Sequence, residues 1–161
     1  MTAMNFFLEL LSSQSDYCYY QSLREEAAAA FQTEQDWQNL ASLAKLPLTD
    51  SALRESLRLN PLAGRGNMRQ VIHKDGLTLP GGHHLPPNAW IGASVIGIQR
   101  DDRYYTESDQ FQPFRFVQSH TETSSDTNVA SGTNTKQSRN TVYLATAEDK
   151  FMAWGYGRHS W

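Results

Sequence analysis

The sequence predicts an α+β fold in which a mainly helical first part is followed by a small sheet of hairpins. Through residues 1–61, apolar residues recur at helical spacing, and Pro47 and Pro61 interrupt the pattern. From residue 62 to 96, short apolar runs are separated by turn signals such as Asp75-Gly76. These observations divide the chain into a helical part, residues 1–61, and a hairpin sheet, residues 62–96.

Composition and charge exclude several classes of function. The 161 residues carry a net charge of −3, with 14 Lys and Arg scattered among 17 Asp and Glu, so nucleic acid is not an expected partner. The single cysteine, Cys18, cannot form an internal disulfide, and no Cys/His cluster offers a zinc site. The apolar run from Met4 to Leu11 is too short to span a bilayer, so we expect no membrane segment and a cytoplasmic location for the chain as it stands.

The helical part predicts three helices. Helix-forming residues and a helical apolar spacing mark the first, at Tyr17, Tyr20, Leu23, Ala27 and Phe31. A second helix is expected from about Asp36 to Lys45, where Pro47 ends it. A third is expected from Asp50 to about Asn60, with Thr49 as its N-cap and Pro61 as its stop.

Strands and irregular segments follow. The apolar runs are Met68 to Ile72, Leu77 to Leu79 and Trp90 to Val95. Residues 97–117 contain the aromatic-rich stretch from Tyr104 to Val117, which has neither a helical nor an alternating period and is predicted to be an ordered meander.

Residues 118–141 are nearly all Ser, Thr, Asn, Gln and charged residues. Their apolar area is too small to offset an ordering cost of about 1–2 kcal/mol per residue, so we predict a disordered insertion. Limited proteolysis is expected to cut first in this stretch, and strong protection of its amides in hydrogen exchange would contradict the prediction.

Three short motifs could carry chemistry. Glu55-Ser56-Leu57-Arg58 places a carboxylate and a guanidinium on neighbouring helical turns, which by itself is most simply an exposed ion pair. Phe111-Gln112-Pro113-Phe114-Arg115-Phe116 holds an arginine among aromatic rings, where it has to reach water or a carboxylate. Trp154-Gly155-Tyr156-Gly157-Arg158-His159 combines glycines that admit a flat group with donors for an anionic edge, although a plain Gly-rich tail is the alternative.

The order of these motifs resembles the C-terminal half of a cytochrome P450, a haem-thiolate monooxygenase, and is most similar to fungal microsomal members of natural-product pathways. The resemblance covers nearly the whole chain, because Ser22 to Glu26, Asp75 to Pro80 and Arg100 to Tyr105 also look like segments of this family. It implies the mainly helical C-terminal part of the cytochrome P450 fold with a small hairpin sheet, incomplete, as one partial domain over residues 1–161.

The resemblance also implies roles for individual residues. Glu55, Arg58 and Arg115 would form a buried structural triad that ties the helix to the meander. The residues placed near haem are Arg69, Gly155, Gly157, Arg158 and His159. Residues 142–161 would be a truncated haem-binding loop, and Leu62 to Gly66 would approach the substrate.

The haem-ligand position departs from the family pattern. The loop pattern places the ligand cysteine at position 161, which is Trp161. An indole nitrogen has no available lone pair and cannot replace a thiolate on iron. We therefore expect no metal ligand and no catalytic residue in this chain, and we expect haem not to be bound by it.

Two hypotheses follow. The first is a haem monooxygenase lineage whose intact relatives, at the endoplasmic reticulum membrane, oxidise a lipophilic secondary metabolite with O2 and electrons from an NADPH-dependent reductase. On this hypothesis the chain is truncated and inactive as it stands. The second is a non-catalytic remnant or a binding protein, which the absent cysteine favours for the chain itself.

Overall fold

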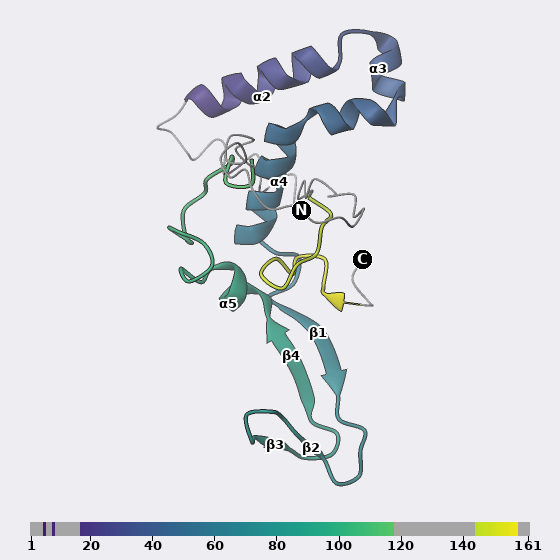
Figure 1. Ribbon diagram of the computed structural model, residues 1–161, viewed down its shortest axis with the longest axis vertical. Coiled ribbons are helices and arrows are strands. Elements are labelled where there is room, and N and C mark those ends of the chain that lie inside the picture. The colour runs from purple at the N-terminus through teal and green to yellow at the C-terminus, as the bar shows by residue number, and fades with distance from the viewer. Residues whose placement is uncertain (1–4, 6–7, 9–16, 118–143, 158–161) are drawn as a thin grey trace, which may run out of the picture.

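The computed structural model describes residues 5, 8, 17–117 and 144–157, which form an elongated molecule (Figure 1). One end is helical, a small two-stranded tip forms the other end, and a central helix lies between them. The predicted insertion at 118–141 lies outside the described residues, as do Arg158, His159 and Trp161.

The helical part contains α2 (Tyr17–Ala30), α3 (Glu34–Gln38), the 3-10 helix η1 (Leu40–Lys45) and α4 (Pro47–Leu59). The first helix agrees with the apolar spacing. The prediction of a single helix from Asp36 to Lys45 is wrong, because the helical conformation is interrupted at Asn39, between α3 and η1. That residue has an extended backbone, and its side-chain oxygen accepts a hydrogen bond of 3.0 Å from the Ala41 N–H. An asparagine that caps the following turn competes with helix continuation.

The start of α4 also differs from the expectation. Pro47 begins this helix rather than ending the previous one, because its fixed φ suits the first helical turn and its missing N–H leaves no donor unpaired there. Thr49 is not the N-cap. Instead, the N–H groups of Leu48 and Thr49 donate to the Glu26 carboxylate at 2.6 and 2.9 Å, and the Thr49 hydroxyl donates to it at 2.7 Å. A carboxylate from α2 thus caps α4.

This tertiary cap gives a testable prediction. Glu26→Ala is expected to lower the free energy of unfolding by about 1–2 kcal/mol, because it removes a charge-assisted cap from three donors at the positive end of a helix. Chemical denaturation measures the change. Glu25→Ala is the matched control, since Glu25 is exposed and accepts only from Gln21 among the side-chain bonds described for α2. Equal effects of the two variants would contradict the cap.

The strands form two small antiparallel sheets. In the first, β1 (Arg65–Gln70) pairs with β4 (Trp90–Ser94), and in the second, β2 (Leu77–Thr78) pairs with β3 (His84–Leu85). The expectation of one sheet of hairpins is corrected in this detail, because β2 and β3 form a separate pair at the tip of the connection between β1 and β4 (Figure 1).

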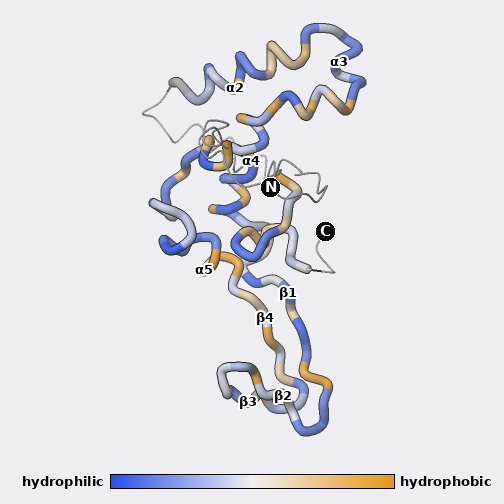
Figure 2. Tube along the Cα trace, in the orientation of Figure 1, coloured by the Kyte–Doolittle hydropathy of each residue, from blue (hydrophilic) through white to orange (hydrophobic). Residues whose placement is uncertain are grey.

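A short helix that the sequence did not predict follows β4 directly. It is α5 (Val95–Gln99), and the Ser94 hydroxyl caps it by accepting from the Gly97 N–H at 3.2 Å. Figure 2 shows α5 as an apolar stretch between β4 and the hydrophilic loops that follow. The run from Trp90 to Val95 therefore ends as a strand one residue early and turns into the core.

Buried residues gather around α4. Leu57 and Ala52 of this helix are fully or almost fully buried, and Val95, Phe151 and Met152 are buried residues from later segments. The same helix also buries polar and charged side chains, namely Ser51, Arg54, Glu55, Ser56 and Arg58. Burial of so many polar groups requires partners from elsewhere in the chain. No helix among the described residues is long and apolar enough to cross a membrane.

Candidate functional site

One face of α4 carries a buried ion cluster. Arg58 and Glu55 face each other through two contacts of 2.8 Å, from Nε to Oε2 and from Nη2 to Oε1. Arg115 joins them with its Nε 3.0 Å from Glu55 Oε1. The side chains of Glu55 and Arg58 are 0% exposed, so the interpretation of Glu-x-x-Arg as an exposed ion pair is wrong.

The remaining donors of this cluster hold the meander. Arg58 Nη1 donates to the carbonyl oxygens of Gln99 and Ser108, at 2.6 and 2.5 Å. Arg115 Nη1 donates to the Thr106 carbonyl at 2.6 Å. A buried ion pair is stable only when its other hydrogen-bonding atoms are also satisfied, and here backbone carbonyls satisfy them. Residues 99–115, which have no helix or strand beyond α5, are thereby fixed against α4.

A second set of contacts links α4 to residues 144–157. Asp50 Oδ2 accepts a hydrogen bond of 2.8 Å from the Leu144 N–H. One turn later, Arg54 Nη1 donates to the Thr146 carbonyl at 2.9 Å, and its Nη2 lies 3.5 Å from Glu148 Oε2. Burial raises the pKa of the Asp50 carboxyl, while the Leu144 N–H and the charge of Arg54 lower it in part. The helix thus contacts segments from both sides of the undescribed stretch.

Gln99 at the end of α5 connects the two sets. Its side-chain amide donates to the carbonyls of Leu57 and Arg58, at 3.2 and 2.9 Å, and its Oε1 accepts from the Met152 N–H at 2.8 Å. Gln99 is fully buried, so all three bonds are shielded from water. The end of α4 is therefore joined through one glutamine to Met152, in the segment 144–157, which we call the C-terminal loop.

Tyr105 supports the same loop from the meander. Its hydroxyl donates to the Lys150 carbonyl at 3.0 Å. Burial raises the pKa of this phenol to about 12, because the charged phenolate would lose its solvation there.

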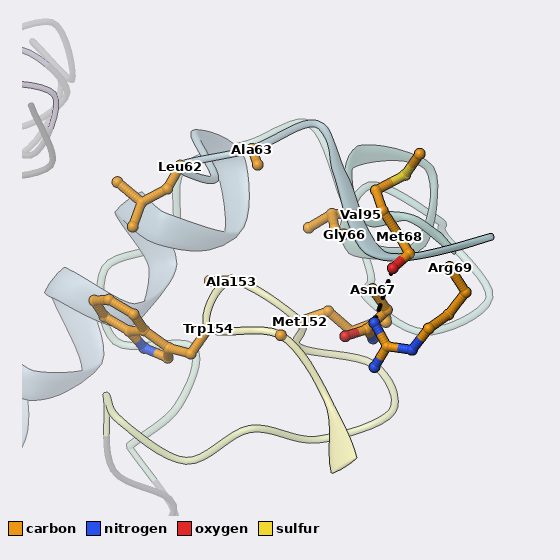
Figure 3. A pocket seen from close by; sticks show the side chains of 11 residues that line it. Leu62, Ala63, Gly66, Asn67, Met68, Arg69, Val95, Met152, Ala153 and Trp154 are labelled. Carbon is orange, nitrogen blue, oxygen red and sulfur yellow. Dashed lines mark hydrogen bonds between the residues drawn. The ribbon is translucent and has the colours of Figure 1, made fainter. Parts of the chain in front are cut away.

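A pocket of about 360 Å³ opens where the start of β1 faces the C-terminal loop (Figure 3). One wall runs from Leu62 through Gly66 to Arg69, and the other runs from Met152 to Gly155, with Val95 between them. Most of the lining is apolar. Among the lining residues described, Arg69 is the charged one, and its Nη1 donates to the Met68 carbonyl at 2.9 Å.

The local backbone explains how the two walls approach each other. The pairing of β1 with β4 shifts register between Gly66 and Arg69, and Asn67 adopts a positive φ of 52° in this bulge. Asn67 Oδ1 then accepts a hydrogen bond of 3.3 Å from the Tyr156 N–H. On the other wall, Gly155 has a φ of 85°, which favours glycine and turns the chain after Trp154.

The structure brings some of the predicted site residues together and not others. Glu55, Arg58 and Arg115 lie in one cluster, and Arg69 and Gly155 line one pocket. Gly157 also has a left-handed φ, of 78°, but a Cβ there would meet no atom within 4 Å, so its need for glycine lies in the backbone and not in a close contact among the described residues. The contacts of Arg158 and His159 lie outside the described residues.

Sequence reasoning missed Arg54 and Gln99. The i, i+4 spacing of Asp50 and Arg54 was a signal for one shared helix face, although not for its burial. Gln99 gave no signal, because a lone glutamine after an apolar run looks like an ordinary polar residue.

A family model described as Cytochrome P450 matches residues 1–160. The chain belongs to the cytochrome P450 family. This confirms the resemblance inferred from the order of the motifs, and the mixed helical and sheet architecture confirms the predicted α+β fold of a partial cytochrome P450.

Fungal cytochrome P450 monooxygenases are similar over almost the entire chain. The monooxygenase nodZ of Hypoxylon pulicicidum is 40% identical over 156 residues, which are 95% of this chain and 30% of the relative. The monooxygenase polB of Polytolypa hystricis is 37% identical over 160 residues, which are 98% of this chain and 29% of the relative. The chain thus spans about 30% of the length of these curated relatives.

Solved cytochrome P450 structures show the same fold. A zebrafish cytochrome P450 with progesterone superimposes with a TM-score of 0.65 at 18% identity, covering 99% of this chain and 29% of that one. A cyanobacterial cytochrome P450 bound to retinoic acid gives a TM-score of 0.62 at 21% identity, covering 99% of this chain and 30% of that one.

Membership of the cytochrome P450 family implies haem, and the described residues fit one edge of this group but not its iron. The pocket offers apolar walls for a flat macrocycle and Arg69 for an anionic edge. Among the described residues, the lining includes no thiol, imidazole or carboxylate, and no cluster of three or more His, Cys, Asp or Glu could hold a metal ion. Cytochrome P450s generally use a reductase as redox partner and lipophilic substrates, and their fungal members are typically microsomal.

Proposed function

We propose that these residues form one side of the haem pocket, together with its buried support, in a fungal cytochrome P450 monooxygenase that oxidises a lipophilic secondary metabolite. The observation that carries the proposal is the pocket itself, in which β1 and the C-terminal loop, distant in sequence, face each other with an apolar lining and one cation. The intact protein would take its electrons from an NADPH-dependent reductase at the endoplasmic reticulum membrane.

Several residues of the pocket and of its support have a defined task in this proposal. Haem would supply the activation of O2. Arg69 would bind its carboxylates, because a guanidinium forms strong charge-assisted hydrogen bonds with them. Leu62 and Ala63 would present apolar surface to the substrate and exclude water. Glu55, Arg58 and Arg115 would act structurally, by holding the meander on which the C-terminal loop rests.

The residue at position 161 supports the further proposal that these 161 residues by themselves are a non-catalytic polypeptide. Trp161 stands where the family pattern places the ligand thiolate, and Cys18 is the one cysteine of the chain. An indole has no lone pair available for iron, and the family pattern places the ligand at position 161 and not in the segment that contains Cys18.

A chimera tests the proposed function. The 161 residues replace the matched segment of the relative nodZ, once with Trp161 and once with Trp161→Cys. The cysteine chimera is expected to give a thiolate-type Soret band in the reduced-CO difference spectrum, and the tryptophan chimera is not. Absence of haem from a folded cysteine chimera would contradict the assignment of the pocket.

Arg69 gives a sharper test within the cysteine chimera. Arg69→Gln is expected to accelerate haem loss to apomyoglobin by about tenfold or more, because it removes a charge-assisted contact worth about 1.5–3 kcal/mol. Arg65→Gln is the matched control, since Arg65 is an exposed arginine of the same strand that does not line the pocket. Equal rates for the two variants would show that Arg69 does not bind the haem edge.

A further inference from the structure

Arg54 occupies a position that neither the ion cluster nor the pocket explains. Its side chain is 0% exposed although it carries a guanidinium, and it lies one helical turn before Arg58 on the same face of α4. Burial lowers the pKa of this guanidinium from its ordinary value, and the nearby Glu148 carboxylate partly restores it. Burying a guanidinium costs free energy unless charged and hydrogen-bonding partners compensate for the lost water.

The contacts of Arg54 converge on one closed turn. Glu148 and Phe151 exchange two backbone hydrogen bonds, of 3.0 and 3.1 Å, so residues 148–151 form a closed turn. Arg54 contacts the residues at both ends of this turn. Its Nη2 lies 3.5 Å from the Glu148 carboxylate, and its guanidinium carbon lies 3.8 Å from the centre of the Phe151 aromatic ring. The bond to the Thr146 carbonyl fixes the residues just before the turn.

Aromatic packing connects this turn to the meander. Phe116 packs edge-to-face against both Phe151 and Tyr105, with ring centres 6.2 Å apart in both pairs. Arg54 also lies 4.9 Å from the centre of the Phe116 ring. Arg58 lies 5.0 Å from the centre of the Tyr105 ring. Two buried guanidinium groups of the same helix therefore contact these three aromatic rings.

The Met152–Gly155 wall of the pocket begins immediately after the turn at residues 148–151. Phe151 is 0% exposed, and the next four residues, Met152 to Gly155, line the pocket. Any displacement of Phe151 has to move Met152, because the two residues are adjacent in the chain.

We infer that Arg54 is a positioning residue that sets the place of the Met152–Gly155 wall by holding the 148–151 turn against α4. Arginine suits this task, because its planar group stacks on Phe151 while its edge donates to Thr146 and faces Glu148. Lysine has the charge but neither the flat face nor the fork of donors. The statement that this wall borders haem rests on the proposed function. The contacts by which Arg54 holds the turn do not depend on it.

Residue-resolved hydrogen exchange of the 161-residue chain without haem tests the inference. The reporters are the amides of Leu144 and Met152, whose own acceptors are Asp50 and Gln99. Arg54→Met leaves these acceptors in place, so a loss of protection reports displacement of the segment. In Arg54→Met we expect the protection factors of both reporter amides to fall about tenfold or more, while those of the α4 amides stay unchanged. In Arg54→Lys we expect an intermediate fall.

Arg58→Met is the matched control, because it removes an equally buried arginine of the same helix that contacts other segments. Its largest loss is expected at the Gln112 amide, which donates to Glu55, and not at Leu144. The inference is overturned if the wild-type reporters are unprotected, if Arg54→Lys matches the wild type, or if both Arg54 variants lose protection equally throughout α4 and residues 144–152. Since no haem is present, failure here leaves the proposed function standing, and failure of the nodZ chimera leaves this result standing.

Discussion

Arg115→Ala is expected to lower the free energy of unfolding of the cysteine chimera by about 3–5 kcal/mol, because it leaves a buried carboxylate with one of its two cationic partners. Glu55 Oε1 accepts from Arg115 Nε at 3.0 Å, and the Arg115 side chain is only 10% exposed. The same substitution removes the donor to the Thr106 carbonyl, so the meander loses a tether at the same time. Chemical denaturation of folded chimeras measures the difference.

Arg103→Ala is the matched control for this prediction. Arg103 also forms an ion pair within the same irregular segment, with Asp101 at 2.6 Å, but its side chain is 80% exposed. Solvent screens such a pair, so little change in stability is expected. If Arg115→Ala were as mild as Arg103→Ala, the proposed structural triad would be wrong.

Neither the 161-residue polypeptide nor its Trp161→Cys variant is expected to give a thiolate-type Soret band in the reduced-CO difference spectrum. The wild-type residue cannot supply a thiolate. The variant can, but a haem protein also needs a dry and shaped cavity around the iron. The described residues supply one side of such a cavity, and the chain matches about 30% of the length of its relatives. A cysteine at position 161 would therefore lack most of its surroundings.

The two outcomes that would contradict this prediction have different meanings. A thiolate-type band in the wild-type polypeptide would refute the assignment of position 161 as the ligand position. A band in Trp161→Cys alone would show that this part of the pocket and one thiolate are enough to hold haem. Expression of both polypeptides with haem supplied, with the cysteine chimera as positive control, separates these outcomes.

Local signals accounted for much of the fold. The helical spacing from Tyr17 to Phe31 predicted α2, and Pro61 marked the end of α4 within two residues, because periodicity and proline act over a single turn. Asn39 and Pro47 misled the prediction at the junctions, since each can either end one helix or begin the next. The apolar runs between Gly and Pro turns located β2 and β4 to within one residue, but they placed the first strand at 68–72 instead of 65–70 and did not separate the β2–β3 pair from the first sheet.

The sequence by itself determined the family, because the order of Glu55-x-x-Arg58, the Arg115 segment and the Trp154–Gly157 segment is specific even though each motif alone is weak. Only the tertiary structure decided what these residues touch. The burial of Glu55 and Arg58, the cap that Glu26 provides for α4, and the grip of Arg54 on Phe151 all join segments far apart in the chain. Such contacts depend on how elements pack, and packing responds to the shape and charge of every neighbour at once, which spacing along one helix cannot encode.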